Sequence, residues 1–245
     1  MEERTRELNL ALKKEKELVE MKSKFVSIAS HEFRTPLSSI SLASGFIRKY
    51  KLRMTPDELD KKLQNIETQV DHMAYLLDDV LTIGKSEAGK IKVNRSTVNI
   101  RKLFESLVED ATQSTHGSHR IKVEINCTMD SFPGDEKLMR SIIINLLTNA
   151  IKFSPGRDEV ELTVSCYENE MFILVRDFGM GIPPEDMDKL FESFYRGGNV
   201  TAISGTGLGL SIVKKAVDLL GGEVKVTSNL GEGTEFTVRI PLKHG

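Results

Sequence analysis

The 245-residue sequence lacks several features that mark particular classes of protein. It contains no run of 18 apolar residues, so we expect no membrane span in this chain. The first 24 residues are charged and have no apolar stretch of the kind found in a signal peptide. The formal net charge of -2 gives no general attraction for nucleic acid or anionic lipid. These absences favour a cytoplasmic protein that has no nucleic-acid partner.

Cysteine is also scarce, since Cys127 and Cys166 are the only two in the chain. Both lie in apolar alternating segments. Because disulfides are rare in cytosolic proteins, we expect two buried thiols and assign them no function.

The residues that are present divide the chain into two parts. A hydrophobic fraction of 39% and a charged fraction of 29% are typical of a globular protein, and the length favours two domains. In the first part, apolar residues recur every seven positions, at Leu12, Val19, Val26, Phe33, Ile40 and Ile47. This spacing predicts one long amphipathic helix.

A break in the pattern follows at residues 51–56, where Thr55 can cap and Pro56 can begin a second helix. The second helix carries apolar residues at three-four spacing, at Leu59, Leu63, Ile66, Val70, Met73, Leu77, Val80 and Leu81. A single antiparallel hairpin cannot cover both stripes, so we expect a homodimer in which two hairpins form a four-helix bundle. The alternative is that both helices pack onto the C-terminal part of the same chain.

The periodicity changes after the polar stretch 86–89, where we place the domain boundary. Strand-like segments lie at 121–127, 160–167, 171–176, 223–227 and 234–240. Helical patterns lie at 100–111, 136–153 and 208–220. A turn at Gly231-Glu232-Gly233 predicts a hairpin and hence a partly antiparallel sheet. The expected fold class is α+β, a helical hairpin followed by a two-layer α/β sandwich.

The first helix contains a polar segment around His31. On a helical wheel His31 lies about 140° from Val26 and about 160° from Phe33, which predicts a solvent-facing imidazole. Glu32 could accept a proton from the ring and leave the other nitrogen as a neutral nucleophile. Pro36 should bend the helix at this point.

A second polar group lies on the helix predicted at 136–153. Asn145, Asn149 and Lys152 are spaced at i, i+4 and i+7, which places them on one face. Asparagine oxygens suit Mg²⁺ and a lysine can neutralise phosphate charge, so the spacing fits a metal-phosphate site. The alternative is that these three residues form a solvent-exposed polar face that binds no ligand.

Two glycine-containing segments could complete a ligand site. Asp177 follows an apolar strand and precedes Gly179 and Gly181, where the absent side chains let a ligand approach the backbone. The segment 205–211 opens a helix, whose amides and dipole can receive phosphates. Between them, residues 197–201 predict a flexible lid or, alternatively, a plain loop.

These segments resemble those of a known family. Ser30-His31-Glu32-Phe33-Arg34-Thr35-Pro36-Leu37 matches the phosphoacceptor box of sensor histidine kinases at every position. The four later segments, in their order and spacing, resemble the nucleotide-binding boxes of the histidine-kinase ATP domain, which has the GHKL (Bergerat) fold of gyrase-type ATPases.

The resemblance implies a two-component kinase that uses ATP and Mg²⁺ to phosphorylate His31 and then an aspartate of a response regulator. It implies that Glu32 is the acid/base partner and that Thr35 positions water in a phosphatase reaction. It also implies an upstream sensor domain joined through a coiled-coil linker at 1–20, a dimerisation domain at 21–87 and an ATP domain at 88–245. The protein would lie in the cytoplasm, or would be the cytoplasmic part of a larger, membrane-attached sensor.

The resemblance also assigns the nucleotide contacts. Asn149 would bind Mg²⁺, Asn145 and Lys152 would support it and contact phosphate, Asp177 would bind adenine and Arg196 would reach the γ-phosphate. Phe153 stands where many relatives have tyrosine, so a hydroxyl contact is not expected there. The remaining pocket residues are Gly179, Gly181, Gly205, Thr206, Gly207, Leu208 and Gly209.

Other readings fit less well. Asp177-Phe178-Gly179 is also typical of Ser/Thr/Tyr kinases, but their lysine strand and catalytic loop are missing. The glycine run begins no βαβ unit, which excludes a dinucleotide-binding fold. A gyrase-type ATPase would share the nucleotide-binding segments but would not need His31 on a dimerising helix. A non-catalytic scaffold would keep the helical repeats but would not need the nucleotide-binding residues. His116 and His119 lack two further metal ligands, so we expect them to be loop residues.

Overall fold

The computed structural model describes residues 12, 30, 33–87, 93–114, 118–198, 203 and 206–242. The chain divides into two compact units, Met1–Asp78 and Asp79–Gly245. Among the described residues, none of the helices combines the length and the hydropathy of a membrane-spanning segment. The predicted linker at 1–20 lies outside the described residues except for Leu12.

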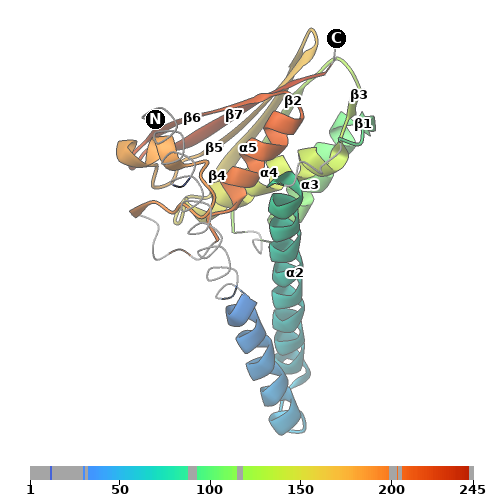
Figure 1. The fold of residues 1–245 in the computed structure, drawn as a ribbon. Helices are drawn as coiled ribbons and strands as arrows, with labels where there is room; N and C mark the ends of the chain where they lie inside the picture. Colours follow the sequence, from blue (N-terminus) through green and yellow to red (C-terminus); the bar gives the residue numbers. More distant parts are fainter. Residues whose placement is uncertain are drawn as a thin grey trace. The chain divides into compact units, whose positions relative to one another are not determined.

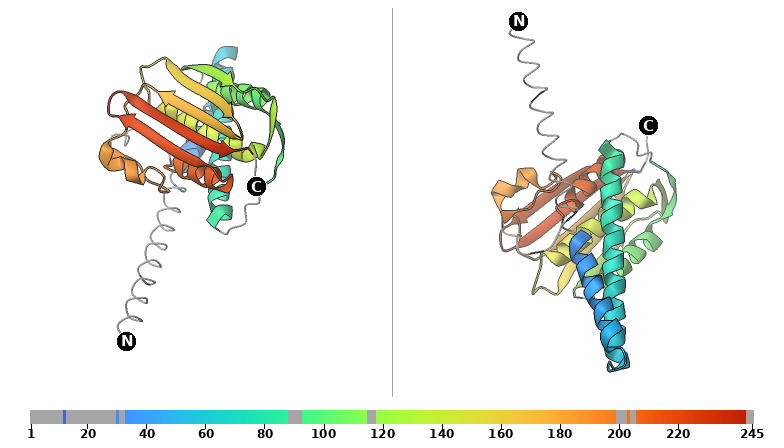
Figure 2. Two further views of the ribbon diagram at one scale, coloured as in Figure 1. Left: turned by 90° about the horizontal axis from the view of Figure 1, so that it is seen from above. Right: turned by 60° about the horizontal axis from the view of Figure 1, so that its bottom comes forward.

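The first unit contains the predicted helical hairpin, formed by a helix at residues 33–50 and the start of α2 (Pro56–Glu87). These antiparallel helices lie side by side in Figures 1 and 2. Ser39 of the first helix donates a hydrogen bond to Asn65 of α2 at 3.2 Å, and Ala43 is buried. The hairpin expected from periodicity is therefore confirmed.

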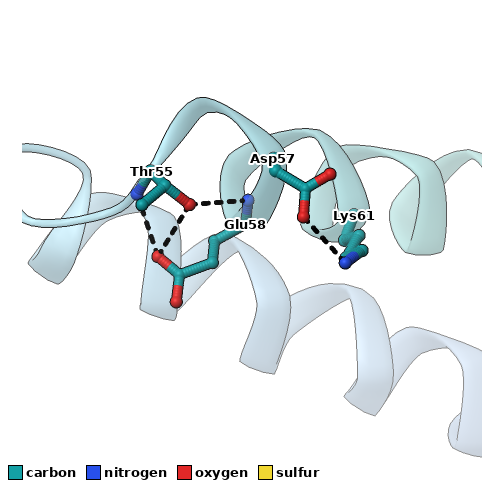
Figure 3. Close-up of polar contacts among 4 residues, drawn as sticks. All are labelled: Thr55, Asp57, Glu58 and Lys61. Carbon is teal, nitrogen blue, oxygen red and sulfur yellow. Dashed lines mark hydrogen bonds and ion pairs between the residues drawn. The ribbon is translucent and has the colours of Figure 1, made fainter.

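Thr55 and Glu58 form a reciprocal cap at the start of α2 (Figure 3). The Glu58 N–H donates to Thr55 Oγ1 at 3.3 Å, while the Thr55 N–H donates to Glu58 Oε2 at 2.9 Å. Two amides that the helix cannot satisfy are thus paired by side chains. Asp57 and Lys61 add an ion pair one turn apart, but both are exposed, so its contribution is small.

The second unit is an α/β sandwich. Its elements are β1 (Ser96–Asn99), α3 (Ile100–Ser114), β2 (Arg120–Asn126), β3 (Ser131–Gly134), α4 (Glu136–Lys152), β4 (Glu159–Tyr167), β5 (Glu170–Asp177), η1 (Pro184–Lys189), α5 (Gly209–Leu219), β6 (Glu223–Asn229) and β7 (Gly233–Pro241). The larger sheet has the order β2-β4-β5-β7-β6, in which β2 and β4 are parallel and the other pairs antiparallel. β1 and β3 form a separate antiparallel pair.

Helices α3, α4 and α5 lie on one face of the larger sheet, as the opposed views in Figures 1 and 2 show. Burial alternates along the strands, because successive side chains point to opposite faces. Leu162 of β4, Ile173 of β5 and Val238 of β7 are fully buried and belong to the same hydrophobic core as Leu146 and Leu147 of α4. This two-layer arrangement confirms the predicted α+β fold class.

Two short strands and the 3-10 helix η1 were not predicted from the sequence. β1 and β3 have four residues each, too few to establish a period, and Pro133 lies within β3. Proline is tolerated there because neither strand of an isolated pair needs a ladder bond on both sides.

The expectation for the cysteines is wrong. Cys127 and Cys166 form a disulfide with a Cα–Cα distance of 4.7 Å. Asn126 of β2 pairs with Ser165 of β4, so the next residues of these parallel strands face each other. The parallel pairing brings together two side chains that are 39 residues apart in the sequence, which local periodicity does not show.

Candidate nucleotide-binding site

α4 presents the predicted polar face. Its N-terminus is capped by the buried Asp135, whose Oδ1 accepts the N–H of Lys137 at 3.0 Å and of Leu138 at 3.1 Å. The apolar side of the helix is buried in the core, while Asn145 and Asn149 remain partly exposed. The cap and the core thus fix α4 and leave the asparagine face accessible.

The asparagine amides lie against the start of α5. Asn145 Nδ2 donates to the Ser141 carbonyl at 2.8 Å. A Cβ on Gly209 would lie 2.7 Å from Asn145 Oδ1 and 3.6 Å from Asn149 Nδ2. Within the described residues, no hydrogen bond of the Asn149 side chain is found. The structure therefore brings the predicted asparagines and the predicted glycine-rich helix start together.

The C-terminal end of α4 is bonded to the loop after β5. The Met180 N–H donates to the Phe153 carbonyl at 3.0 Å. A Cβ on Gly179 would lie 2.2 Å from the same carbonyl oxygen, closer than any real contact. Glycine is thus required at 179 by close approach of two backbones, and Phe153 contributes through its main chain. Its ring faces Lys152, whose Nζ lies 5.0 Å from the ring centroid.

Asp177 ends β5 as a buried carboxylate with a relative exposure of 5%. Its Oδ1 accepts the Gly179 N–H at 2.8 Å, and the Thr234 N–H gives a second backbone hydrogen bond. Burial raises the pKa of the Asp177 carboxyl above its ordinary value of 3.8, and the two hydrogen bonds oppose this shift. The group is held in place as an acceptor in a poorly solvated position.

The β6–β7 turn supports this loop from the other side. Gly181 has φ 66°, and a Cβ there would lie 2.1 Å from the Asn229 carbonyl oxygen. The Gly231 N–H donates to the Met180 carbonyl at 2.8 Å, and the Ile182 N–H donates to Ser228 Oγ at 2.9 Å. Sequence reasoning identified the turn as a hairpin but missed its role beside Asp177, since no local pattern signals that contact.

The segment before the predicted lid contacts the start of α5. The Phe194 N–H donates to the Gly207 carbonyl at 2.9 Å, and Gly207 has φ 71°. Thr206 Oγ1 accepts the Leu208 N–H at 3.2 Å, and the Leu208 side chain is buried. Phe194 itself has φ 69°, an unusual conformation for a non-glycine residue.

Tyr195 and Arg196 follow with defined partners. The Tyr195 hydroxyl donates to Asp186 Oδ1 of η1 at 2.6 Å, a bond the sequence did not predict. This hydrogen bond to the carboxylate is the main reason that the pKa of Tyr195 rises to about 12. The Arg196 guanidinium donates to the Ile203 carbonyl. Arg196, predicted to reach a phosphate, thus spans the two ends of the predicted lid.

The other predicted site residues are distributed as follows. His31, Glu32, Gly205 and the lid segment 199–201 lie outside the described residues. Thr35 is exposed on the first helix of the hairpin.

Comparisons with known proteins match separate parts of the chain. Residues 21–89 match the family described as His Kinase A (phospho-acceptor) domain. Residues 134–244 match the family described as Histidine kinase-, DNA gyrase B-, and HSP90-like ATPase. Together these are the domains of a sensor histidine kinase catalytic core.

The kinase core is similar to curated histidine kinases over nearly its whole length. It is 34% identical over 245 residues to the circadian input-output histidine kinase CikA of Thermosynechococcus vestitus, a match that covers 98% of this chain. The kinase core spans 34% of the length of that relative.

Solved structures agree with this assignment. Full-length ShkA in complex with AMPPNP has a TM-score of 0.63 and 29% identity, covering 88% of this chain and 45% of that one. The histidine kinase AdeS of Acinetobacter baumannii also has a TM-score of 0.63, at 23% identity, with coverage of 87% and 98%. The similarity to AdeS supports only the fold of the kinase core.

Proposed function

We propose that the kinase core transfers the γ-phosphoryl group of ATP to His31 and then to an aspartate of a response-regulator receiver domain. The observation that carries this proposal is the convergence of four sequence-distant segments, α4 among them. The loop after Asp177 bonds to the end of α4 through backbone groups, the asparagine side chains of α4 lie against Gly209 at the start of α5, and the Phe194 N–H donates to the Gly207 carbonyl. We place the functional domains at 21–87 and 88–245, with a coiled-coil input linker at 1–20.

The site has the chemistry needed for ATP. The Asp177 carboxylate is an acceptor for the adenine amino group in a buried position, where such a bond discriminates strongly between bases. At Gly179 and Gly181 the neighbouring backbone lies too close for a Cβ, so no side chain can project from either position. At the other end, the first amides of α5 follow glycines and can receive phosphate oxygens.

The donor set also fits Mg²⁺. Asn149 would hold the ion through its amide oxygen, with Asn145 beside it, because Mg²⁺ prefers oxygen ligands and retains several waters. When bound, the ion would neutralise charge on the phosphate oxygens. Lys152, one turn after Asn149, supplies a second positive charge for the phosphates.

The role of the protein at the phosphoacceptor is to supply a nucleophile in a defined protonation state. Glu32 accepts the proton of one imidazole nitrogen of His31, so that the other attacks the γ-phosphorus as ADP leaves. Thr35, one turn later, is exposed and positions water when the phosphorylated regulator is hydrolysed. The regulator is a separate partner, and the input comes from a sensor domain joined to the linker.

Dimerisation is part of the proposal. Leu63, Val70 and Leu77 of α2 recur every seven residues and are exposed by 45%, 51% and 51%. On the first helix, Leu42 and Phe46 are also exposed. Such a stripe is the seam of a helical bundle, and a second copy of the hairpin would cover it.

The test is incubation of the purified protein with Mg²⁺ and [γ-³²P]ATP. We expect protein-bound label that is acid-labile and base-stable, and we expect His31→Gln to abolish it. His72→Gln is the matched control, since it removes another histidine of the helical region and should retain the label. Phosphate release without labelled protein would favour a conformational ATPase of the gyrase type instead.

A second variant tests the metal role. Asn149→Asp should lose autophosphorylation while size-exclusion chromatography with light scattering still shows the dimer. Normal labelling in this variant would contradict the role of Asn149, and a monomeric wild type would contradict the bundle.

A further inference from the structure

His119 lies outside the nucleotide-binding segments yet contacts the end of α4. It precedes β2, and its Nε2 lies 3.0 Å from the Ser154 carbonyl oxygen and 3.1 Å from Ser154 Oγ. Its Nδ1 lies 3.0 Å from Ser118 Oγ. Ser154 is fully buried, immediately after the C-cap residue Phe153. The ring therefore joins the α3–β2 loop to the residue that follows the C-cap of α4.

The partners determine where the ring carries its hydrogen. Ser154 Oγ donates its only hydrogen to the helix, to the Ala150 carbonyl at 2.6 Å. Both Ser154 atoms that face the ring are thus acceptors, which requires a hydrogen on His119 Nε2. The neutral Nε2–H tautomer meets this need, and its Nδ1 accepts the Ser118 hydroxyl hydrogen.

The end of α4 is where the two halves of the nucleotide site meet. The Phe153 N–H donates to the Asn149 carbonyl at 2.9 Å, on the helix that carries the asparagine face. The Phe153 carbonyl accepts the Met180 N–H at 3.0 Å, in the loop that carries Asp177. Ser154, the residue after this junction, is tied back to α4 because its Oγ donates to the Ala150 carbonyl at 2.6 Å. The Ser154 carbonyl accepts the Arg157 N–H at 3.2 Å, and His119 adds a second donor, which comes from the α3–β2 loop.

We infer that His119 is a positioning residue, which fixes the last turn of α4 against the Asp177 loop through its Nε2–H bond to Ser154 and thereby sets the affinity for Mg-ATP. This inference rests on the proposed function. Within the described residues, the hydrogen bonds of His119 involve Ser118 and Ser154, and none involves the asparagine face or Asp177. A metal role is not favoured, because the described residues contain no cluster of three or more His, Cys, Asp or Glu side chains suited to an ion.

Three substitutions of His119 distinguish the effect of the hydrogen-bond donor from the effects of side-chain size and polarity. His119→Gln places an amide N–H at about the position of Nε2, His119→Asn places it at about that of Nδ1, and His119→Leu has no donor. One lost hydrogen bond to a buried acceptor corresponds to a factor of about ten, so we expect Leu and Asn to raise KM for Mg-ATP about tenfold. We expect Gln to stay within about threefold of wild type, and the maximal labelling rate to change less than KM in all three.

Nucleotide affinity is measured independently by calorimetry with AMPPNP and Mg²⁺, and folding by circular dichroism and thermal melting. Weak binding by the Leu and Asn variants with restoration by Gln supports the inference, provided that the melting temperatures agree. Equal affinity of all three variants and wild type overturns it, as does a loss that Gln fails to restore in a folded protein. A wild type that neither binds AMPPNP nor becomes labelled contradicts the proposed function itself.

Discussion

At the scale of single residues, the site contains side chains whose pKa is shifted by their surroundings. Asp177 is a carboxylate in a buried position, and Tyr195 is a phenol hydrogen bonded to a carboxylate. Asp177 is held by the nearby Gly179 and by Thr234 of β7, while Tyr195 is held by Asp186, nine residues earlier. Their chemistry therefore differs from that of the free amino acids in ways that titration can measure.

Asp177→Asn separates binding from stability. Because the folded pKa of Asp177 is above 3.8, the folded state holds the proton more tightly, so ionisation lowers stability as the pH rises from 3.8 through the folded pKa. We expect the stability of the Asn variant relative to wild type to increase over this window and then level off. Affinity for AMPPNP should fall by about 100-fold, as expected when a buried acceptor is mismatched. Urea unfolding at several pH values and calorimetry measure these effects, and a pH-independent difference would contradict the first.

Tyr195 should resist ionisation. Its folded pKa of about 12 lies above the ordinary 10.0, so the stabilisation by Asp186 is present below pH 10.0 and is lost as the pH rises through about 12. At a pH between these values, the absorbance difference between wild type and Tyr195→Phe should show only a minor fraction of phenolate. In the Asp186→Asn background the same difference should show phenolate. Equal phenolate in both backgrounds would exclude Asp186 as the cause.

At the scale of elements, helix ends carry much of the organisation. α2 begins at a reciprocal cap, α4 begins at Asp135 and ends against His119, and α5 begins at the glycines of the site. Capping residues are recognisable in the sequence because the partner lies within three residues. The contact of His119 at the end of α4 could not be recognised in the sequence, because its donor precedes its acceptor by 35 residues.

Thr55→Ala should weaken the hairpin. Loss of the hydroxyl that accepts the Glu58 N–H should cost about 1 kcal/mol in the free energy of unfolding. Thr68→Ala is the matched control on the same helix, because Thr68 only bonds back to the Gln64 carbonyl within the helix. Urea unfolding followed by circular dichroism compares the two. Equal losses would show that the cap adds nothing beyond general helix effects.

At the scale of the whole molecule, the sheet sets which distant residues meet. Asp177 at the end of β5 pairs with Val160 at the start of β4, while the disulfide lies at the other end of β4, at Cys166. Cys166 lies six positions after Val160 along the strand, a distance of about 20 Å. Stability and nucleotide binding should thus respond separately at the two ends.

Reduction of the disulfide should lower stability without changing the affinity for AMPPNP. The bond closes a loop with a sequence separation of 39 residues. Opening such a loop typically costs about 2 to 4 kcal/mol. Thermal melting with and without a phosphine reductant tests this, and the Cys127→Ser/Cys166→Ser variant should be insensitive to the reductant. Two freely reactive thiols in the native, unreduced protein would contradict the bond.

The sequence by itself determined the helical hairpin, the larger sheet and the fold class. Periodicity predicted the hairpin and all five strands of the larger sheet, because burial on one face imposes a regular spacing on apolar residues. The positions of Asn145, Asn149 and Asp177 could be predicted because each follows a local pattern on a helix or at a strand end.

Only the tertiary structure decided the pairings that no local pattern records. The parallel alignment of β2 with β4 brought two cysteines together, and packing of the β6–β7 turn placed Ser228 and Thr234 beside the Asp177 loop. Close approach of two backbones made glycine necessary at 179. These contacts depend on distances between elements, which are fixed when the core packs and which spacing along one chain does not specify.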